Sequence, residues 1–298
     1  MAGKTLKTWI AATRPWSFTA SAMSALTMLA YLAWSEGSID LLSSLWAIGT
    51  IILFQAAGNT WSDWLDYRRG VDAADTHGAD SITSGRFSPE AIRNLSLGLY
   101  AAACTAGIGL LLYTGLPLLW VGLVGLLGAL YYPPLKYHAL GDVVILLLYS
   151  VLPAWGISCV ATGSYHSTTL WVALPVGLLV DAILHANNTR DMHTDRRAQV
   201  TTLAHVLGVQ GSVIFYMFAT LTPFICVLIT SAIGILPLCS MLTMLLLPAA
   251  LRNCEAMSNF HDETNATGIS TLDLRSARLH LCFCAALSLT LLLDLWLQ

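Results

Sequence analysis

The sequence predicts an all-α, polytopic membrane helix bundle. Of its 298 residues 56% are hydrophobic and only 10% are charged, and the mean hydropathy is +0.68. Soluble domains carry roughly 25% charged residues. In addition, apolar runs close to the roughly 20 residues that a helix needs to cross a bilayer recur along the whole chain. We therefore expect one integral-membrane domain over residues 1–298.

The apolar runs divide the chain into nine expected transmembrane helices. Their approximate limits are Trp16–Trp34, Leu42–Gly58, Leu95–Tyr113, Pro117–Tyr132, Val143–Ala161, Leu170–Asn187, Val213–Ser231, Leu236–Leu251 and Leu279–Leu297.

The basic residues predict how these helices are oriented. With nine spans, all 14 Lys and Arg residues fall in segments on one side. The connections on the other side contain none; these are residues 35–40, 114–116, 162–168 and 233–235. Because basic loops stay in the cytoplasm, we expect a cytoplasmic N-terminus and a C-terminus outside.

A first polar cluster follows the second apolar run. Asn59, Asp63 and Asp66 stand at i, i+4 and i+7, so a helix places them on one face, and Asp72 follows shortly after. The cluster opens a connection of about 60–88, longer than a simple turn requires. Carboxylates next to a low-dielectric core repel one another and need cations.

A second cluster repeats the pattern after the sixth run. Asn187, Asp191 and Asp195 recur at steps of four, again at the start of a long cytoplasmic connection, about 190–210. Oxygen ligands without a His/Cys pattern favour Mg²⁺ over zinc. Basic residues lie in or beside the same loops: Arg68, Arg69, Lys136, Arg190, Arg196 and Arg197. Carboxylates for a metal together with basic groups for an anion predict a diphosphate site.

These motifs resemble the signature motifs of the UbiA superfamily of intramembrane prenyltransferases, and within it the MenA-like branch with its animal relatives. The resemblance covers nearly the whole chain and weakens after about Gln210. The matching stretches are Arg14-Pro15, Asn59-x-x-x-Asp63-x-x-Asp66-Tyr67-x-x-Gly70-x-Asp72, Ser84-Gly85-x-x-Ser88-Pro89, Tyr132-Pro133-Pro134-Leu135-Lys136, His185-Ala186-Asn187-Asn188-Thr189-Arg190-Asp191-x-x-x-Asp195 and Thr202-Leu203-Ala204.

The resemblance implies an enzyme that transfers a polyprenyl group from its diphosphate to an aromatic acceptor. For this branch the acceptor is 1,4-dihydroxy-2-naphthoate, and the products are a demethylmenaquinone, diphosphate and CO2. The chemistry fits the residues, because negative charge developing on diphosphate is stabilised by Mg²⁺ and basic groups, while an allyl cation needs a dry apolar cavity.

Roles for individual residues follow from this reading. The catalytic Mg²⁺-diphosphate ligands are expected to be Asp63, Asp66, Asp191 and Asp195. Asn59 and Asn187 are expected as further ligands or hydrogen-bonding supports. Near the diphosphate or the acceptor we expect Asp72, Arg14, Lys136 and Arg190, and the ring face of Tyr132 is a candidate for stabilising the cation. Between Asp181 and His185, one turn apart, we expect a structural hydrogen bond.

Two alternatives remain from the sequence. One is an enzyme of the same superfamily with another acceptor, such as a phenol, a chlorophyllide or a lipid precursor. The other is a secondary transporter, although transporters place their ligands near mid-membrane on broken helices, whereas here the acids crowd one end of the spans. The expected partners are the two substrates and membrane lipid, without nucleic acid, and the expected location is a bacterial inner membrane.

Overall fold

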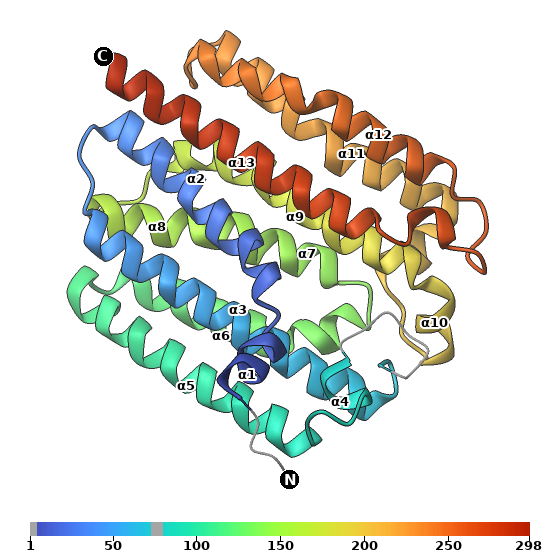
Figure 1. Cartoon of the computed structure of the whole chain (residues 1–298). Coiled ribbons are helices and arrows are strands. Elements are labelled where there is room, and N and C mark those ends of the chain that lie inside the picture. The colour runs from blue at the N-terminus through green and yellow to red at the C-terminus, as the bar shows by residue number, and fades with distance from the viewer. Residues whose placement is uncertain (1–4, 73–79) are drawn as a thin grey trace.

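The computed structural model describes residues 5–72 and 80–298 and is made of helices joined by short connections (Figure 1). Within these residues, extended backbone pairs only in an isolated parallel bridge between His138 and Thr201. Residues 73–79, part of the expected loop at 60–88, lie outside the described residues. The predicted all-α architecture is confirmed for the described chain.

The helical elements follow one another in the order α1 (Leu6–Ala12), η1 (Pro15–Ser17), α2 (Phe18–Glu36), α3 (Leu41–Arg69), α4 (Asp80–Thr83), α5 (Pro89–Thr114), α6 (Pro117–Lys136), α7 (Gly141–Leu146), η2 (Leu147–Val151), α8 (Leu152–Thr162), η3 (Ser167–Thr169), α9 (Leu170–Arg190), α10 (Met192–Arg197), α11 (Leu203–Ala232), η4 (Leu238–Leu246), α12 (Leu247–Ser258), η5 (Thr267–Ile269) and α13 (Leu272–Leu297).

Seven helical segments in the described part of the chain are long and apolar enough to cross a membrane. They are Leu41–Arg69, Pro89–Thr114, Pro117–Lys136, Gly141–Thr162, Ser167–Arg190, Leu203–Ala232 and Thr267–Leu297. The first and eighth expected runs also form helical structure, as α2 and as η4 with α12, but neither is among the seven. The chain is therefore a multi-pass membrane protein, and the count of nine spans stays a prediction.

Helix α3 continues about ten residues beyond the apolar run that predicted it, as far as Arg69. Gly70 then takes the left-handed conformation, with φ 72°, and its N–H binds the carbonyls of Asp66 and Tyr67. Glycine ends helices in this way without steric strain. The first acidic cluster consequently lies on the last turns of a continuous helix.

The helices pack side by side, and α9 is the most enclosed of the seven candidate spans, with 67% of its most apolar window buried. Its residues Val176 and Leu179 join Phe283 and Leu287 of α13 in one hydrophobic core. On another face Gly177 allows close approach, because a Cβ there would lie 2.5 Å from the Cβ of Ser150. Small residues serve such contacts between membrane helices.

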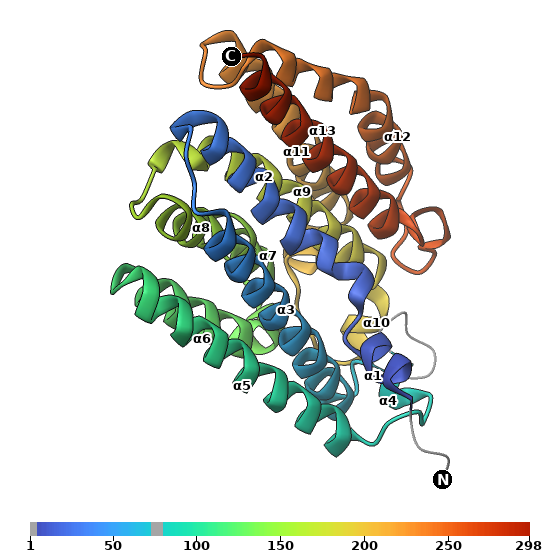
Figure 2. The same cartoon turned by 60° about the vertical axis from the view of Figure 1, so that its left-hand side comes forward.

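The two ends of the bundle differ in what they contain. Figures 1 and 2 both place α1, α4 and α10 at one end, and the C-terminal end of α13 at the opposite end. Helix α3 ends close to α4, and α9 leads directly into α10. Both acidic clusters therefore lie at the same end of the bundle.

Candidate active site

A cavity of about 1210 Å³ opens between the helices and reaches both acidic clusters. Its deeper walls are apolar and come from α3, α5, α6, the α7–α8 segment and α9, with Phe54, Ile108, Leu126, Leu148 and Leu184 as representative lining residues. A cavity of this volume can enclose a small organic molecule or part of a long one.

The mouth of the cavity is highly charged. Among the described residues, six carboxylates line it, namely Asp66, Asp72, Asp80, Asp191, Asp195 and Asp273. Four basic side chains line it as well, namely Arg14, Arg86, Lys136 and Arg190. Acids therefore outnumber bases, and binding an anion there requires an additional cation.

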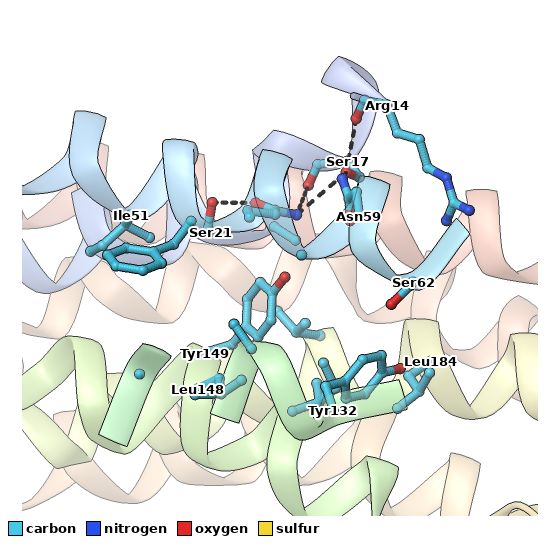
Figure 3. A pocket seen from close by; sticks show the side chains of 18 of the residues that line it. Arg14, Ser17, Ser21, Ile51, Asn59, Ser62, Tyr132, Leu148, Tyr149 and Leu184 are labelled. Carbon is cyan, nitrogen blue, oxygen red and sulfur yellow. Dashed lines mark hydrogen bonds between the residues drawn. The ribbon is translucent and has the colours of Figure 1, made fainter. Parts of the chain in front are cut away.

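On α3, the cluster is held together by the segment that precedes α2. Asn59 donates from Nδ2 to the carbonyl of Thr13 and to the hydroxyl of Ser17, both at 2.9 Å. Figure 3 shows Asn59 beside Ser17. Asp63 is 1% exposed and pairs with Arg14, whose backbone is left-handed at φ 56°. The Asn59 amide thus keeps Oδ1 as its acceptor for a ligand.

Asp66 is held by the end of α6. The Tyr137 hydroxyl donates to Asp66 Oδ1, and Lys136 Nζ lies 3.9 Å from Oδ2. Tyr137 packs with Val71 and Val200 in a small hydrophobic cluster that joins the connections after α3, α6 and α10. Tyr137 therefore both orients a predicted ligand and fixes the loops around it.

The second cluster differs because its helix is interrupted. Asp191, at φ −92° and ψ 5°, ends α9, and α10 begins at Met192. Arg190 donates from Nε and Nη2 to the two oxygens of Asp191, each at 2.8 Å. Arg190 also donates from Nη1 to Asp273 Oδ2 at 2.8 Å. Its guanidinium is thus shared by two carboxylates.

Asp195 lies on α10, outside the candidate spans, and is 6% exposed. Burial is the main cause that raises the pKa of this carboxyl to about 7, and Asp191 and Asp66 add to the effect, against the lowering influence of Lys136 and Arg190. A carboxyl in this environment favours neutralisation by a proton or by a metal ion.

The donor set fits Mg²⁺ in one particular way. No three His, Cys, Asp or Glu side chains in the described ranges lie close enough together to hold a metal by themselves. Mg²⁺, however, commonly takes one or two carboxylates and completes its shell with water and substrate phosphates. Asp63 Oδ2, which is buried and has no hydrogen-bond partner in the described structure, is an oxygen that a cation could satisfy.

Two tyrosines face α3 across the cavity (Figure 3). Tyr132 was expected from the sequence, and it lines the cavity. Tyr149 was not expected; it lies on the π-helical turn η2, a kind of irregularity that is frequent at functional sites. Gln55, also missed, lies one turn deeper than Asn59 and donates to the carbonyl of Ser17 at 2.8 Å.

The cavity brings together most of the residues singled out in the sequence. Of these, Arg14, Asn59, Asp66, Asp72, Tyr132, Lys136, Asn187, Arg190, Asp191 and Asp195 line it, and Asp63 lies beneath Arg14. Sequence reasoning missed Tyr137 and Asp273. Tyr137 directly follows the Lys136 motif and could have been found there, whereas nothing in the local sequence links Asp273 to Arg190.

The expected bond between Asp181 and His185 is wrong. His185 Nδ1 lies 3.0 Å from Asp142 Oδ1, on α7, while Asp181 Oδ1 is buried without a partner among the described residues. Helical spacing puts i and i+4 side chains on one face, but here packing against α7 supplies a partner from another helix. Neither Asp181 nor His185 lines the cavity.

The geometry defines a class of protein: a membrane helix bundle with an acid-rich mouth that opens into an apolar chamber. A comparison with known families identifies it further, since residues 23–267 match the UbiA prenyltransferase family. The chain belongs to this family.

Individual relatives support the assignment. The UbiA prenyltransferase domain-containing protein 1 of Danio rerio is 33% identical over 231 residues, which is 74% of this chain and 68% of that protein. The chain thus matches about two thirds of the length of that relative.

Two solved structures share the fold. One, of digeranylgeranylglyceryl phosphate synthase, has a TM-score of 0.65 at 18% identity and covers 96% of this chain and 98% of its own. The other, a UbiA homologue from Archaeoglobus fulgidus bound to GPP and Mg²⁺, has a TM-score of 0.60 at 11% identity, covering 94% of this chain and 99% of its own. At these identities the likeness concerns the fold.

Proposed function

We propose that the protein transfers a polyprenyl group from a polyprenyl diphosphate to an aromatic acceptor in a Mg²⁺-dependent reaction. The observation that carries the proposal is the continuity of one cavity from a charged mouth to an apolar chamber. The diphosphate then lies at the mouth with Asp66, Asp191 and Asp195, and the isoprenoid runs between the helices.

In this proposal, Asp66, Asp191 and Asp195 would hold Mg²⁺, which would supply positive charge to the diphosphate as the allylic C–O bond breaks. The protein's own groups bind the diphosphate and exclude water. Arg14, Lys136 and Arg190 line the mouth and supply donors to phosphate oxygens. The apolar chamber excludes water from the allyl cation, and the ring of Tyr132 presents its face to that cation.

The acceptor we propose is 1,4-dihydroxy-2-naphthoate, in keeping with the motifs of the MenA-like branch. Its prenylation at the carbon that bears the carboxylate breaks the C–CO2 bond, releases CO2 and gives a demethylmenaquinol, the reduced form of a demethylmenaquinone. A carboxylated acceptor favours a basic partner at the mouth, where Lys136 and Arg190 lie.

The decisive experiment incubates the purified protein with Mg²⁺, polyprenyl diphosphates of several lengths and a panel of acceptors: the naphthoate, simple phenols, a chlorophyllide and a glycerol phosphate lipid precursor. Mass spectrometry identifies the product. We expect the decarboxylated, prenylated naphthalenediol, with one diphosphate and one CO2 released per product. A product formed only with another acceptor would change the acceptor assignment, whereas solute movement across vesicles with no diphosphate released would favour a transporter.

We further propose that the charged mouth faces the cytoplasm, with the N-terminus on the same side and the C-terminus across the membrane after nine spans. In a cysteine-free background, a reagent confined to the outside should label Ser164→Cys and fail to label Thr264→Cys. The reverse labelling would overturn this orientation. The membrane that we propose is a bacterial inner membrane.

A further inference from the structure

Arg190 is bound by two carboxylates that come from different helices. Its Nε and Nη2 atoms donate to both oxygens of Asp191, and Nη1 donates to Asp273 Oδ2, all at 2.8 Å. The Arg190 side chain is 8% exposed. Asp273 belongs to α13, 83 residues further along the chain, and lies beyond residues 23–267 that match the family.

Asp273 is held firmly in place. Its Oδ1 accepts from the backbone N–H of Leu274 at 2.8 Å, so both carboxylate oxygens are engaged. It lies in the first turn of α13, where negative charge is favoured by the helix dipole. The neighbouring Leu272 is fully buried, and Ser276 bonds the hydroxyl of Tyr216 at 2.7 Å, which ties this turn to α11.

The arrangement creates a competition at Asp191. Both Asp191 oxygens already accept from Arg190, and bidentate guanidinium–carboxylate pairs are strong. Each Asp191 oxygen keeps a second lone pair, but a metal ion bound there repels the guanidinium and competes with it for the carboxylate. If Asp191 were the sole partner of Arg190, losing it to the metal ion would leave a nearly buried guanidinium without a counter-charge.

Asp273 removes this obstacle. With Asp273 bound to Nη1, Arg190 keeps a carboxylate partner when Asp191 turns to a metal ion. A guanidinium has five N–H groups, and three are used here, so one on Nη1 and one on Nη2 remain for an anion at the mouth.

We propose that Asp273 is a positioning residue of the donor site: it anchors Arg190 at the mouth while Asp191 exchanges Arg190 for the divalent cation that arrives with the diphosphate. This inference rests on the proposed function. It assigns to α13 a part in binding the donor.

The test uses the isosteric change Asp273→Asn, which keeps the shape and removes the charge. Calorimetry measures Mg²⁺-dependent binding of a non-hydrolysable geranyl thiolodiphosphate, and steady-state kinetics separates the Michaelis constants from kcat. We expect about tenfold weaker binding of the analogue and an about tenfold higher Michaelis constant for the donor. The kcat at saturation and the Michaelis constant for the acceptor should stay within about twofold.

Two further variants make the test specific. Asp273→Glu restores the charge and should return analogue binding to within about twofold of the wild type. Glu263→Gln is the matched control, because Glu263 forms a similar two-bond pair with Arg196, at 2.6 and 3.0 Å, at the same end of the bundle but does not line the cavity. It should leave analogue binding unchanged.

The outcomes distinguish the inference from the function on which it rests. Wild-type affinity in Asp273→Asn, a failure of Asp273→Glu to restore binding, or an equal loss in Glu263→Gln overturns the role of Asp273 alone. If the wild-type protein neither binds the analogue with Mg²⁺ nor transfers a prenyl group, the proposed function itself fails.

Discussion

The two acidic clusters look alike in sequence but are held in opposite ways. On α3 the helix is continuous, and its acids are paired by distant elements: Asp63 by Arg14, and Asp66 by Tyr137 and Lys136. At the end of α9 the helix breaks at Asp191, which is paired by its own neighbour Arg190. The acids of the α3 cluster are therefore paired by residues far away in the sequence, whereas Asp191 is paired by the residue next to it.

This difference suggests a division of labour. The α3 cluster fastens the segment before α2 and the end of α6 to the bundle, so its acids contribute to the fold as well as to ligand binding. At the α9 cluster, Arg190 links Asp191 to Asp273 of α13. Substitutions in the two clusters should therefore differ in how they divide between stability and turnover.

The largest expected effect is the loss of turnover in Asp191→Asn. Removing one metal-binding carboxylate costs about 4 kcal/mol of transition-state stabilisation, so kcat should fall by about three orders of magnitude. Thermal unfolding should change less than in Asp63→Asn, because Asp191 is partly exposed and Arg190 keeps Asp273 as its partner. Turnover that survives either this change or EDTA would contradict the assignment of a Mg²⁺ site.

Asp63→Asn should differ from Asp191→Asn in its effect on stability. Activity should fall as it does for Asp191→Asn. The protein should also lose about 2 kcal/mol of stability, because the ion pair between buried Asp63 and Arg14 is broken. The loss is limited to this size because Arg14 is partly exposed and water can solvate its charge. Thermal unfolding in detergent measures the difference, with Asp191→Asn as the control. Equal melting temperatures for Asp63→Asn and Asp191→Asn would show that the α3 cluster does not contribute more to stability than the α9 cluster.

The third effect concerns the pH dependence of Mg²⁺ binding through Asp195. The pKa of this carboxyl is raised to about 7, so the group is protonated below that pH and Mg²⁺ must displace the proton. Apparent Mg²⁺ affinity should fall about fivefold from pH 7 to pH 6 and level off about one pH unit above 7. Calorimetric titration with the donor analogue checks this, and in Asp195→Asn the slope should flatten.

The smallest expected effect concerns which basic residue, Lys136 or Arg190, binds the carboxylate of the acceptor. Lys136 lies 3.9 Å from Asp66, whereas Arg190 makes three bonds of 2.8 Å, so Lys136 is the more readily available partner for an acceptor carboxylate. Lys136→Gln should raise the Michaelis constant about threefold more for a carboxylated naphthoate than for its neutral analogue. An equal increase in the Michaelis constant for both acceptors would show that the acceptor carboxylate binds away from Lys136.

Much of this organisation could be predicted from the sequence, because it depends on local pattern. Apolar runs located the helices, and the spacing of Asn59, Asp63 and Asp66 correctly placed them on one helical face at its end. The i, i+4 rule also suggested a continuous helix through Asp191 and Asp195. The structure breaks that helix after Arg190, a turn that no glycine or proline announces.

What could not be predicted are contacts between residues far apart in the chain. Asp142 replaces Asp181 as the partner of His185, and Asp273 joins Arg190, because helix packing decides which charged groups meet. Helices α2 and α12 show a further limit. Their apolar runs predicted spans, yet neither is among the segments long and apolar enough to cross a membrane alone.

The bridge between His138 and Thr201 has a consequence for motion. Ala139 N–H binds Thr201 O at 2.7 Å, and Thr201 N–H binds Tyr137 O at 3.2 Å. Tyr137 also packs with Val71 and Val200 in the hydrophobic cluster described above. Three connections separated widely in sequence are thereby joined into one cooperative unit. We expect the amide protons of Ala139 and Thr201 to exchange with solvent at a shared rate, so that the rim around the mouth opens all at once.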